Sequence, residues 1–105
     1  MTLNGTNISM VRGDDETLTV SITDGTFSTG DIVTFTVRQR VDDPILIQKE
    51  VTTFQSGKAV IVIAHADTES LDVGKYVYDI QLMSGGKITT IVKKSKFTLE
   101  EEVTY

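Results

Sequence analysis

Position 65 holds the only histidine of the chain, which makes it the first residue to consider for chemistry. A serine nucleophile needs a neighbouring base, so a serine–histidine–aspartate triad would have to include His65. The sequence has no Gly-x-Ser-x-Gly segment, the pattern that places a reactive serine on a sharp turn after a strand. We therefore expect His65 to be a surface or corner residue, and we predict no catalytic residues and no enzymatic activity.

Clustered carboxylates are the other candidates for chemistry. Asp14, Asp15 and Glu16 are consecutive, and Asp42 and Asp43 form a second pair. Calcium takes about six to eight oxygen ligands, and the chain has no Asp-x-Asp-x-Asp-Gly loop to supply them. One histidine without any cysteine is a poor set of zinc ligands. These carboxylates are interpreted as solvated turns, and we predict no metal site and no cofactor.

The tripeptide Arg12-Gly13-Asp14 matches the integrin-recognition sequence. Three residues recur often by chance, and Gly13 also suits a turn into the next strand. We therefore interpret the tripeptide as a turn.

Composition limits the class of protein further. The chain of 105 residues has 10 basic and 15 acidic residues, a formal net charge of -5, and no cysteine. The acidic balance disfavours nucleic-acid binding, and the lysines at 93, 94 and 96 are interpreted as protecting a strand edge. No signal peptide is visible, and no apolar run reaches the roughly 20 residues of a membrane helix. We predict one domain over residues 1–105, folded in a reducing cytoplasm, without nucleic-acid or membrane partners.

Apolar residues recur at every second position along most of the chain, which is typical of half-buried antiparallel strands. Seven strands are predicted, at residues 6–11, 16–23, 31–40, 45–51, 58–64, 74–82 and 88–100. The run from Ala59 to Ala64 is apolar throughout, so this strand is expected to be covered on both sides. Residues 84–87 predict a hairpin turn, and a change of parity near residues 93–95 predicts a bulge in the last strand.

The segment 71–82 carries the strongest single signal for the fold. Residues 67–71 predict one helical turn capped by Asp67, and Gly74 then opens a strand. Tyr76 and Tyr78 follow on one side of that strand. A helical turn, a glycine and Tyr-x-Tyr are typical of the corner between strands E and F in immunoglobulin-like β-sandwiches. In such a corner the hydroxyl of Tyr76 closes the turn and Tyr78 points into the core.

A candidate interface is the strand that begins Ile45-Leu46-Ile47. These three side chains cannot all point inward, since neighbours in a strand face opposite sides. Either a partner covers the outward side or a loop of this chain folds over it. Tyr105, in a terminal segment that could reach a neighbouring protein, is the other candidate interface residue.

Several segments together resemble one family, and they are residues 12–14, 18–20, 33–38, 57–61, 66–68, 71–82 and 96–99. The most specific is Gly-x-Tyr-x-Tyr-Asp-Ile-Gln-Leu at 74–82. The chain resembles the immunoglobulin-like domain of tailed-bacteriophage virion proteins, best known as the N-terminal domain of the upper baseplate protein family. The resemblance implies an immunoglobulin-like sandwich and a non-enzymatic part that anchors a longer protein to the virion, often as a trimer. Because the sequence stops at Tyr105, a decorating subunit of capsid, neck or fibre stays open beside a baseplate position.

The expected function is that of a phage virion structural protein, made in the bacterial cytoplasm and acting through contacts with other virion proteins. We also expect it to form a homo-oligomer, a trimer or dimer. The alternative is an adhesion module that binds host surfaces or carbohydrate through the loops 24–31 and 84–87. Only Phe27, Phe54 and Tyr105 offer aromatic platforms outside the strands, and tryptophan is absent. An enzyme built on His65 or a carboxylate pair is the least favoured hypothesis.

Overall fold

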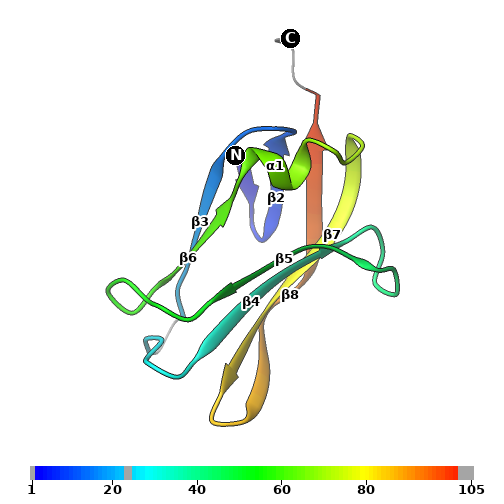
Figure 1. Ribbon diagram of the computed structural model, residues 1–105. Coiled ribbons are helices and arrows are strands. Elements are labelled where there is room, and N and C mark those ends of the chain that lie inside the picture. Colours follow the sequence, from blue (N-terminus) through cyan, green and yellow to red (C-terminus); the bar gives the residue numbers. More distant parts are fainter. Residues whose placement is uncertain (1, 23–24, 102–105) are drawn as a thin grey trace.

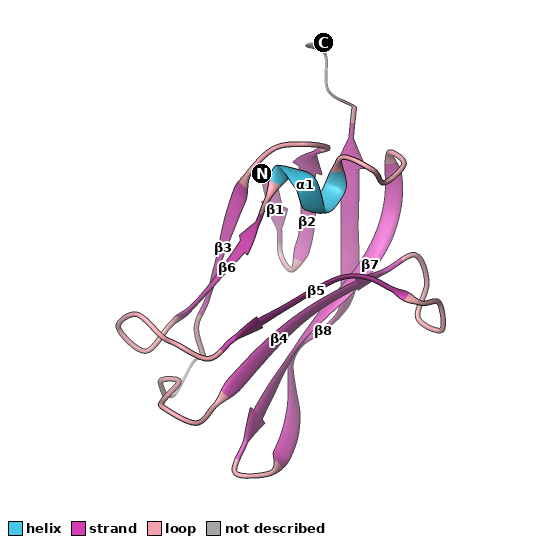
Figure 2. Ribbon diagram, viewed as in Figure 1, coloured by secondary structure: helices cyan, strands magenta, loops and turns pink. Residues whose placement is uncertain are grey.

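The computed structural model describes residues 2–22 and 25–101, and these residues are folded almost entirely into β-strands (Figures 1 and 2). The elements are β1 (Thr2–Asn4), β2 (Asn7–Val11), β3 (Glu16–Val20), β4 (Ile32–Arg38), β5 (Ile45–Val51), β6 (Ala59–Ile63), α1 (His65–Thr68), β7 (Gly74–Ser84) and β8 (Lys87–Glu100). The prediction of an all-β fold with one helical turn is confirmed. The predicted count of seven strands is one too low for the described residues, because β1 pairs antiparallel with β2 through a tight turn. Within the described residues, no helix has the length and apolar character needed to cross a membrane.

The strands form two open sheets. The larger sheet has six strands in the order β1-β2-β8-β7-β4-β5, and β3 pairs with β6 in the smaller one. The pairings are antiparallel except for β2 and β8, which run parallel. Strand β5 is therefore a free edge of the larger sheet.

One apolar core joins the two sheets. The larger sheet contributes Ile8, Met10, Val33, Phe35, Val37, Ile47, Tyr76, Tyr78, Ile80, Phe97 and Leu99, and the smaller one Leu18, Val20, Ala59, Ile61 and Ile63. Three of its aromatic rings lie close together, with ring centroids 5.4 Å apart for Phe35 and Tyr78 and 6.2 Å apart for Phe35 and Phe97. Tilted and edge-on rings at such distances attract one another beyond their burial.

The predicted alternation holds in β4, where Val33, Phe35 and Val37 are fully buried and the residues between them are partly exposed. In contrast, the structure corrects the expectation that β6 is covered on both sides. Val62 is 54% exposed, so this strand is not covered on both sides. The reason is that β6 belongs to a two-stranded sheet that packs on the core with one face only. The partner strand β3 ends at Val20, earlier than the predicted end at position 23, which lies outside the described residues.

The last two strands confirm the predicted hairpin and bulge. Gly85 and Gly86 form the two-residue turn with φ of 59° and 79°, values that favour glycine at both positions. The register passes from Tyr78 opposite Ser95 to Ile80 opposite Val92, so β8 holds one extra residue there. A second irregularity follows between Ile80 and Gln81, which the sequence did not indicate.

The helical turn lies earlier than predicted. It spans His65–Thr68, and Asp67 does not precede it but sits in its first turn. The Asp67 carboxylate accepts a hydrogen bond from the Ala64 backbone N–H at 2.7 Å. A residue inside the helix thus provides the acceptor for a backbone donor at the start of the helix. The same carboxylate lies 2.9 Å from the Lys49 ammonium, so α1 is tied to β5 of the larger sheet.

Candidate interaction surface

Tyr76 closes the turn that precedes β7. Its hydroxyl donates to the carbonyl oxygen of Asp72 at 2.6 Å, and its side chain is only 4% exposed. Gly74 lies between them with a φ of 141°, a conformation that side-chain-bearing residues rarely adopt. Burial raises the pKa of Tyr76 above its ordinary value of 10.0, because the phenolate would lose solvation.

Tyr78 points into the core from the same side of β7. Its ring packs beside Phe35 and Phe97, and its hydroxyl donates to the Thr6 carbonyl in the turn between β1 and β2. Burial raises the pKa of this phenol as well. Tyr78 therefore connects the centre of the larger sheet to its N-terminal hairpin.

The three candidate interface residues at the start of β5 differ in their exposure to solvent. Ile47 is buried in the core, whereas Ile45 is 44% and Leu46 is 41% exposed. The pairing with β4 shifts between Val37 and Arg38, and this irregularity lets Ile45 and Leu46 both face solvent. Their exposure means that no loop of the described chain covers them fully. Tyr105, the other candidate, lies outside the described residues.

His65 contacts a carboxylate from a distant turn. Its backbone N–H donates to Asp15 Oδ1 at 2.6 Å, and its ring Nδ1 lies 3.0 Å from the same oxygen. This contact raises the pKa of His65 above 6.5 and holds the pKa of Asp15 below 3.8. Both side chains are largely exposed. The pair thus connects α1 to the turn after β2 at the protein surface.

The tripeptide at 12–14 forms the predicted turn and is held by the fold. The Arg12 guanidinium donates to the Leu71 carbonyl at 3.1 Å, and the Gly13 N–H donates to Thr68 Oγ1 at 2.8 Å. Thr68 is fully buried, and sequence reasoning did not single it out. Gly13 has a φ of 84°, as a turn of this kind requires. Because the fold holds the Arg12 side chain in this way, the tripeptide is poorly placed to bind an integrin.

The carboxylates singled out in the sequence occupy separate turns. Asp14 and Asp15 lie between β2 and β3, where Glu16 is the first residue of β3, and Asp42 and Asp43 lie between β4 and β5. Among the described residues, no group of three or more side chains is arranged to hold a metal ion.

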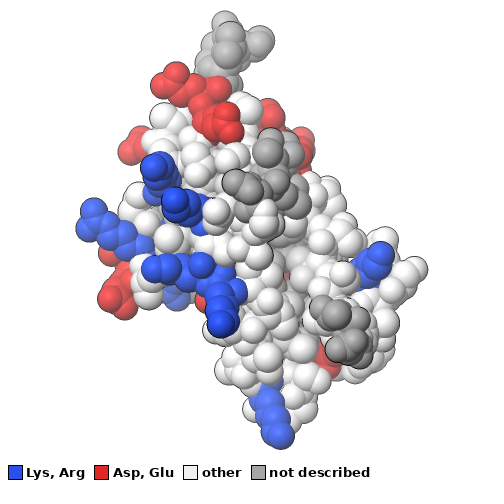
Figure 3. All heavy atoms as spheres, turned by 180° about the vertical axis from the view of Figure 1, so that it is seen from behind, with Lys and Arg blue, Asp and Glu red and all other residues white. Residues whose placement is uncertain are grey.

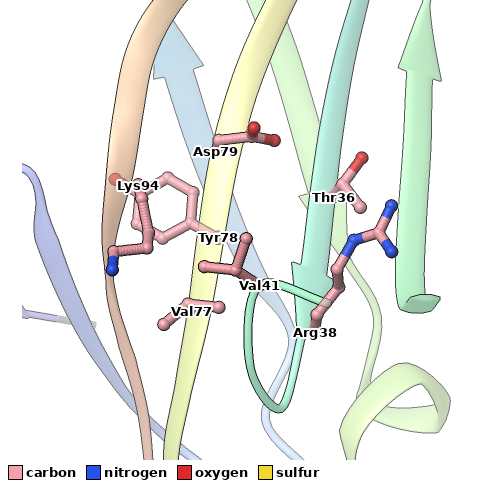
Figure 4. A pocket seen from close by; sticks show the side chains of 7 residues that line it. All are labelled: Thr36, Arg38, Val41, Val77, Tyr78, Asp79 and Lys94. Atoms are coloured by element: carbon pink, nitrogen blue, oxygen red, sulfur yellow. The ribbon is translucent and has the colours of Figure 1, made fainter. Parts of the chain in front are cut away.

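The outer face of the larger sheet carries a hollow of about 80 Å3. Figure 4 shows Val41 and Val77 at its middle, with Arg38 on one side and Lys94 on the other. The strand register places Arg38 of β4 opposite Val77 of β7, and Lys94 comes from the neighbouring strand β8. Sequence reasoning noted Lys94 and Lys96 only as edge protection and missed Arg38.

A second hollow lies where the loop before β4 meets the loop after β5, and it includes Phe27 and Phe54. Phe27 is only 4% exposed, and its ring centroid lies 5.3 Å from that of Phe54. Two of the aromatic residues expected as sugar platforms lie in the described chain. One of them, Phe27, is buried in the core and is not available to a sugar.

Comparisons of the chain with family models, with curated proteins and with solved structures gave no match.

Proposed function

We propose that this chain is a non-enzymatic structural protein of a tailed-bacteriophage virion, with an immunoglobulin-like fold, that acts through contacts with other virion proteins and with copies of itself. The observation that carries the contact function is the free edge of β5, where Ile45 and Leu46 are exposed side by side. Exposed apolar pairs on an unpaired edge strand favour association with another chain.

The strand order supports the immunoglobulin-like part of the proposal. In that fold strands B and E share one sheet, and strands C, F and G share the other. If β3 is counted as strand B, then β6 is E, and the neighbours β8, β7, β4 and β5 are G, F, C and C′. The bond from Tyr76 to the Asp72 carbonyl has the form of a tyrosine corner at the start of strand F. The phage assignment rests on the sequence resemblance, whose most specific segment is this same strand.

The adhesion alternative gains less from the structure. Sugar sites rely on exposed aromatic faces, and Phe27 is buried against Phe54. A glycan array probed with the purified chain tests this alternative directly.

The contact function is tested by the mass of the purified chain in solution, measured by light scattering after gel filtration over a range of concentrations. We expect a dimer or trimer that Leu46→Lys dissociates. The matched control is Val62→Lys, which places the same charge at an exposed valine of the smaller sheet and should leave the oligomer intact. Mass spectrometry of purified particles of the phage that encodes the chain tests the virion assignment. Absence from the particles would contradict that assignment, whatever the oligomeric state.

A further inference from the structure

The outer face of the larger sheet gathers positive charge in a protein whose net charge is -5. Arg38, Lys75, Lys94 and Lys96 project from it, and we call these residues with Val41 and Val77 the basic face. The register sets them together, since Lys75 lies opposite Thr98 and Val77 opposite Lys96 on the neighbouring strand. Within the described residues, none of these four cations forms an ion pair within 4.0 Å. Arg38 donates instead to the main-chain carbonyl of Asp43 at 2.8 Å.

The centre of the basic face is apolar. Val41 is 56% exposed and Val77 lies beside it in the hollow (Figure 4). Among the described residues, Asp79 is the one carboxylate that lines this hollow. An apolar centre with a charged rim is the usual arrangement of a protein–protein interface. The face therefore suits a protein surface that is acidic and carries an apolar side chain.

The same chain carries a surface of the opposite charge at the end of the molecule where α1 lies. Asp15 is bonded to His65, and the Arg12 backbone N–H donates to the Glu100 carbonyl at 3.0 Å. The Arg12 guanidinium reaches the Leu71 carbonyl, which places Asp72 in the same region. We call Asp14, Asp15, Glu69, Asp72, Glu100 and Glu101 the acidic end. From behind, the molecule shows basic side chains gathered around its middle and acidic ones toward this end (Figure 3).

We infer that the basic face of one copy binds the acidic end of a second copy. This inference rests on the self-association in the proposed function and adds a charged contact to the apolar contact at the free edge of β5. The two surfaces lie at different places on one chain, so each copy offers both. A contact between unlike surfaces forms a ring where its rotation closes and an open filament where it does not, or it occurs twice in a dimer. Opposite charge would supply orientation and fast association, and the apolar hollow would supply contact area.

The first test is the salt dependence of self-association, measured by sedimentation velocity of the wild-type chain. Charges are screened over about 30 Å at an ionic strength of about 0.01 M but over about 3 Å at about 1 M. We expect oligomers at low salt and a shift to monomer at high salt. A wild-type chain that stays monomeric at low salt at every concentration would overturn the inference, while particle composition would still decide the virion assignment.

Charge reversal then tests which surfaces meet. The basic-face variant is Lys94→Glu with Lys96→Glu, and the acidic-end variant is Glu100→Lys with Glu101→Lys. All four side chains are exposed, and circular dichroism checks that each variant is folded. Each variant alone should associate at least about tenfold more weakly, because like charges then face one another. Mixing the two variants should restore assembly, since every contact between unlike variants pairs opposite charges again.

The matched control is Lys58→Glu with Lys87→Glu, which makes the same change in net charge at exposed lysines outside the basic face. This control should assemble as the wild type does. If the wild type forms oligomers that the basic-face and acidic-end variants leave unchanged, the inference is wrong although self-association stands. Folded variants that are monomeric alone and do not assemble when mixed would also overturn it.

Discussion

The hydroxyl of Tyr76 lies 2.6 Å from the carbonyl oxygen of Asp72, four residues earlier in the chain. This bond joins the beginning of strand β7 to the segment that follows α1. The Tyr76 side chain is nearly fully buried, so few water molecules can replace its partner. The bond therefore stabilises the turn that leads from the smaller sheet into the larger one.

Replacing Tyr76 by phenylalanine should lower the free energy of unfolding by about 0.5–1.5 kcal/mol. The ring stays in the core, but the part-buried hydrogen bond to the Asp72 carbonyl is lost. The measurement is urea denaturation followed by circular dichroism. Asp72→Ala is the matched control, because the acceptor is the main-chain carbonyl, and its effect should stay within about 0.5 kcal/mol. Equal losses in both variants would mean that the bond contributes little.

Alkaline pH should destabilise the protein through its buried tyrosines. The pKa values of Tyr76 and Tyr78 are raised by burial above 10.0, the value expected in the unfolded chain. Their contribution to stability is therefore complete below about pH 10 and is lost as the pH rises through the folded-state pKa values. Unfolding free energies measured from about pH 8 to about pH 12 should fall over the upper part of that range. The Tyr76→Phe variant should show a smaller fall, and an identical fall would assign the effect to other groups.

The pair of His65 and Asp15 should be visible in a titration by NMR. Asp15 raises the histidine pKa above 6.5, and the histidine N–H groups lower the aspartate pKa below 3.8. The histidine contribution is complete below pH 6.5 and lost as pH rises through its raised pKa, whereas the aspartate contribution is complete above pH 3.8 and lost on acidification. The interaction is therefore fully present between these two values.

Asp15→Asn should return the histidine pKa toward 6.5. Glu16→Gln serves as the control, because it removes a neighbouring charge without touching the bond to His65. A His65 pKa at or below 6.5 in the wild type would contradict the contact.

Two glycines with positive φ should respond differently to alanine. A Cβ at Gly57 would lie 2.5 Å from both Cβ and Cγ2 of Thr26, and φ there is +73°. Gly85 has a φ of +59°, but a Cβ there meets nothing within 4 Å. Both variants should lose about 1–2 kcal/mol for the left-handed backbone, and Gly57→Ala should lose about 1–3 kcal/mol more for the clash. Thermal unfolding of the two variants measures the difference, and equal losses would show that Thr26 moves aside freely.

Much of the local structure could be predicted from the sequence. The side chains of β4 alternate between core and surface, and this alternation is a property of any extended chain with one buried face. The two glycines at 85 and 86 specify their hairpin turn, because few other residues adopt positive φ. The bulge in β8 was also predictable, since an extra residue changes the parity of the apolar positions.

Other expectations were wrong because they depended on neighbours distant in the sequence. The apolar run of β6 gives no sign that Val62 stays exposed, since that follows from the smaller sheet having only two strands. The helical turn begins at His65 because the Asp67 carboxylate reaches back to Ala64, an outcome that a capping pattern read forward along the chain does not show.

By itself, the sequence determined the all-β class, the positions of most strands and the sides that they bury, because alternation and turn chemistry act over a few residues. Only the tertiary structure decided which side chains share a surface. Asp15 meets His65 across 50 positions, and Arg38, Val77 and Lys96 lie in one row across three strands. Such rows depend on the order and register of strands, which are set by packing of the whole core and not by any local segment.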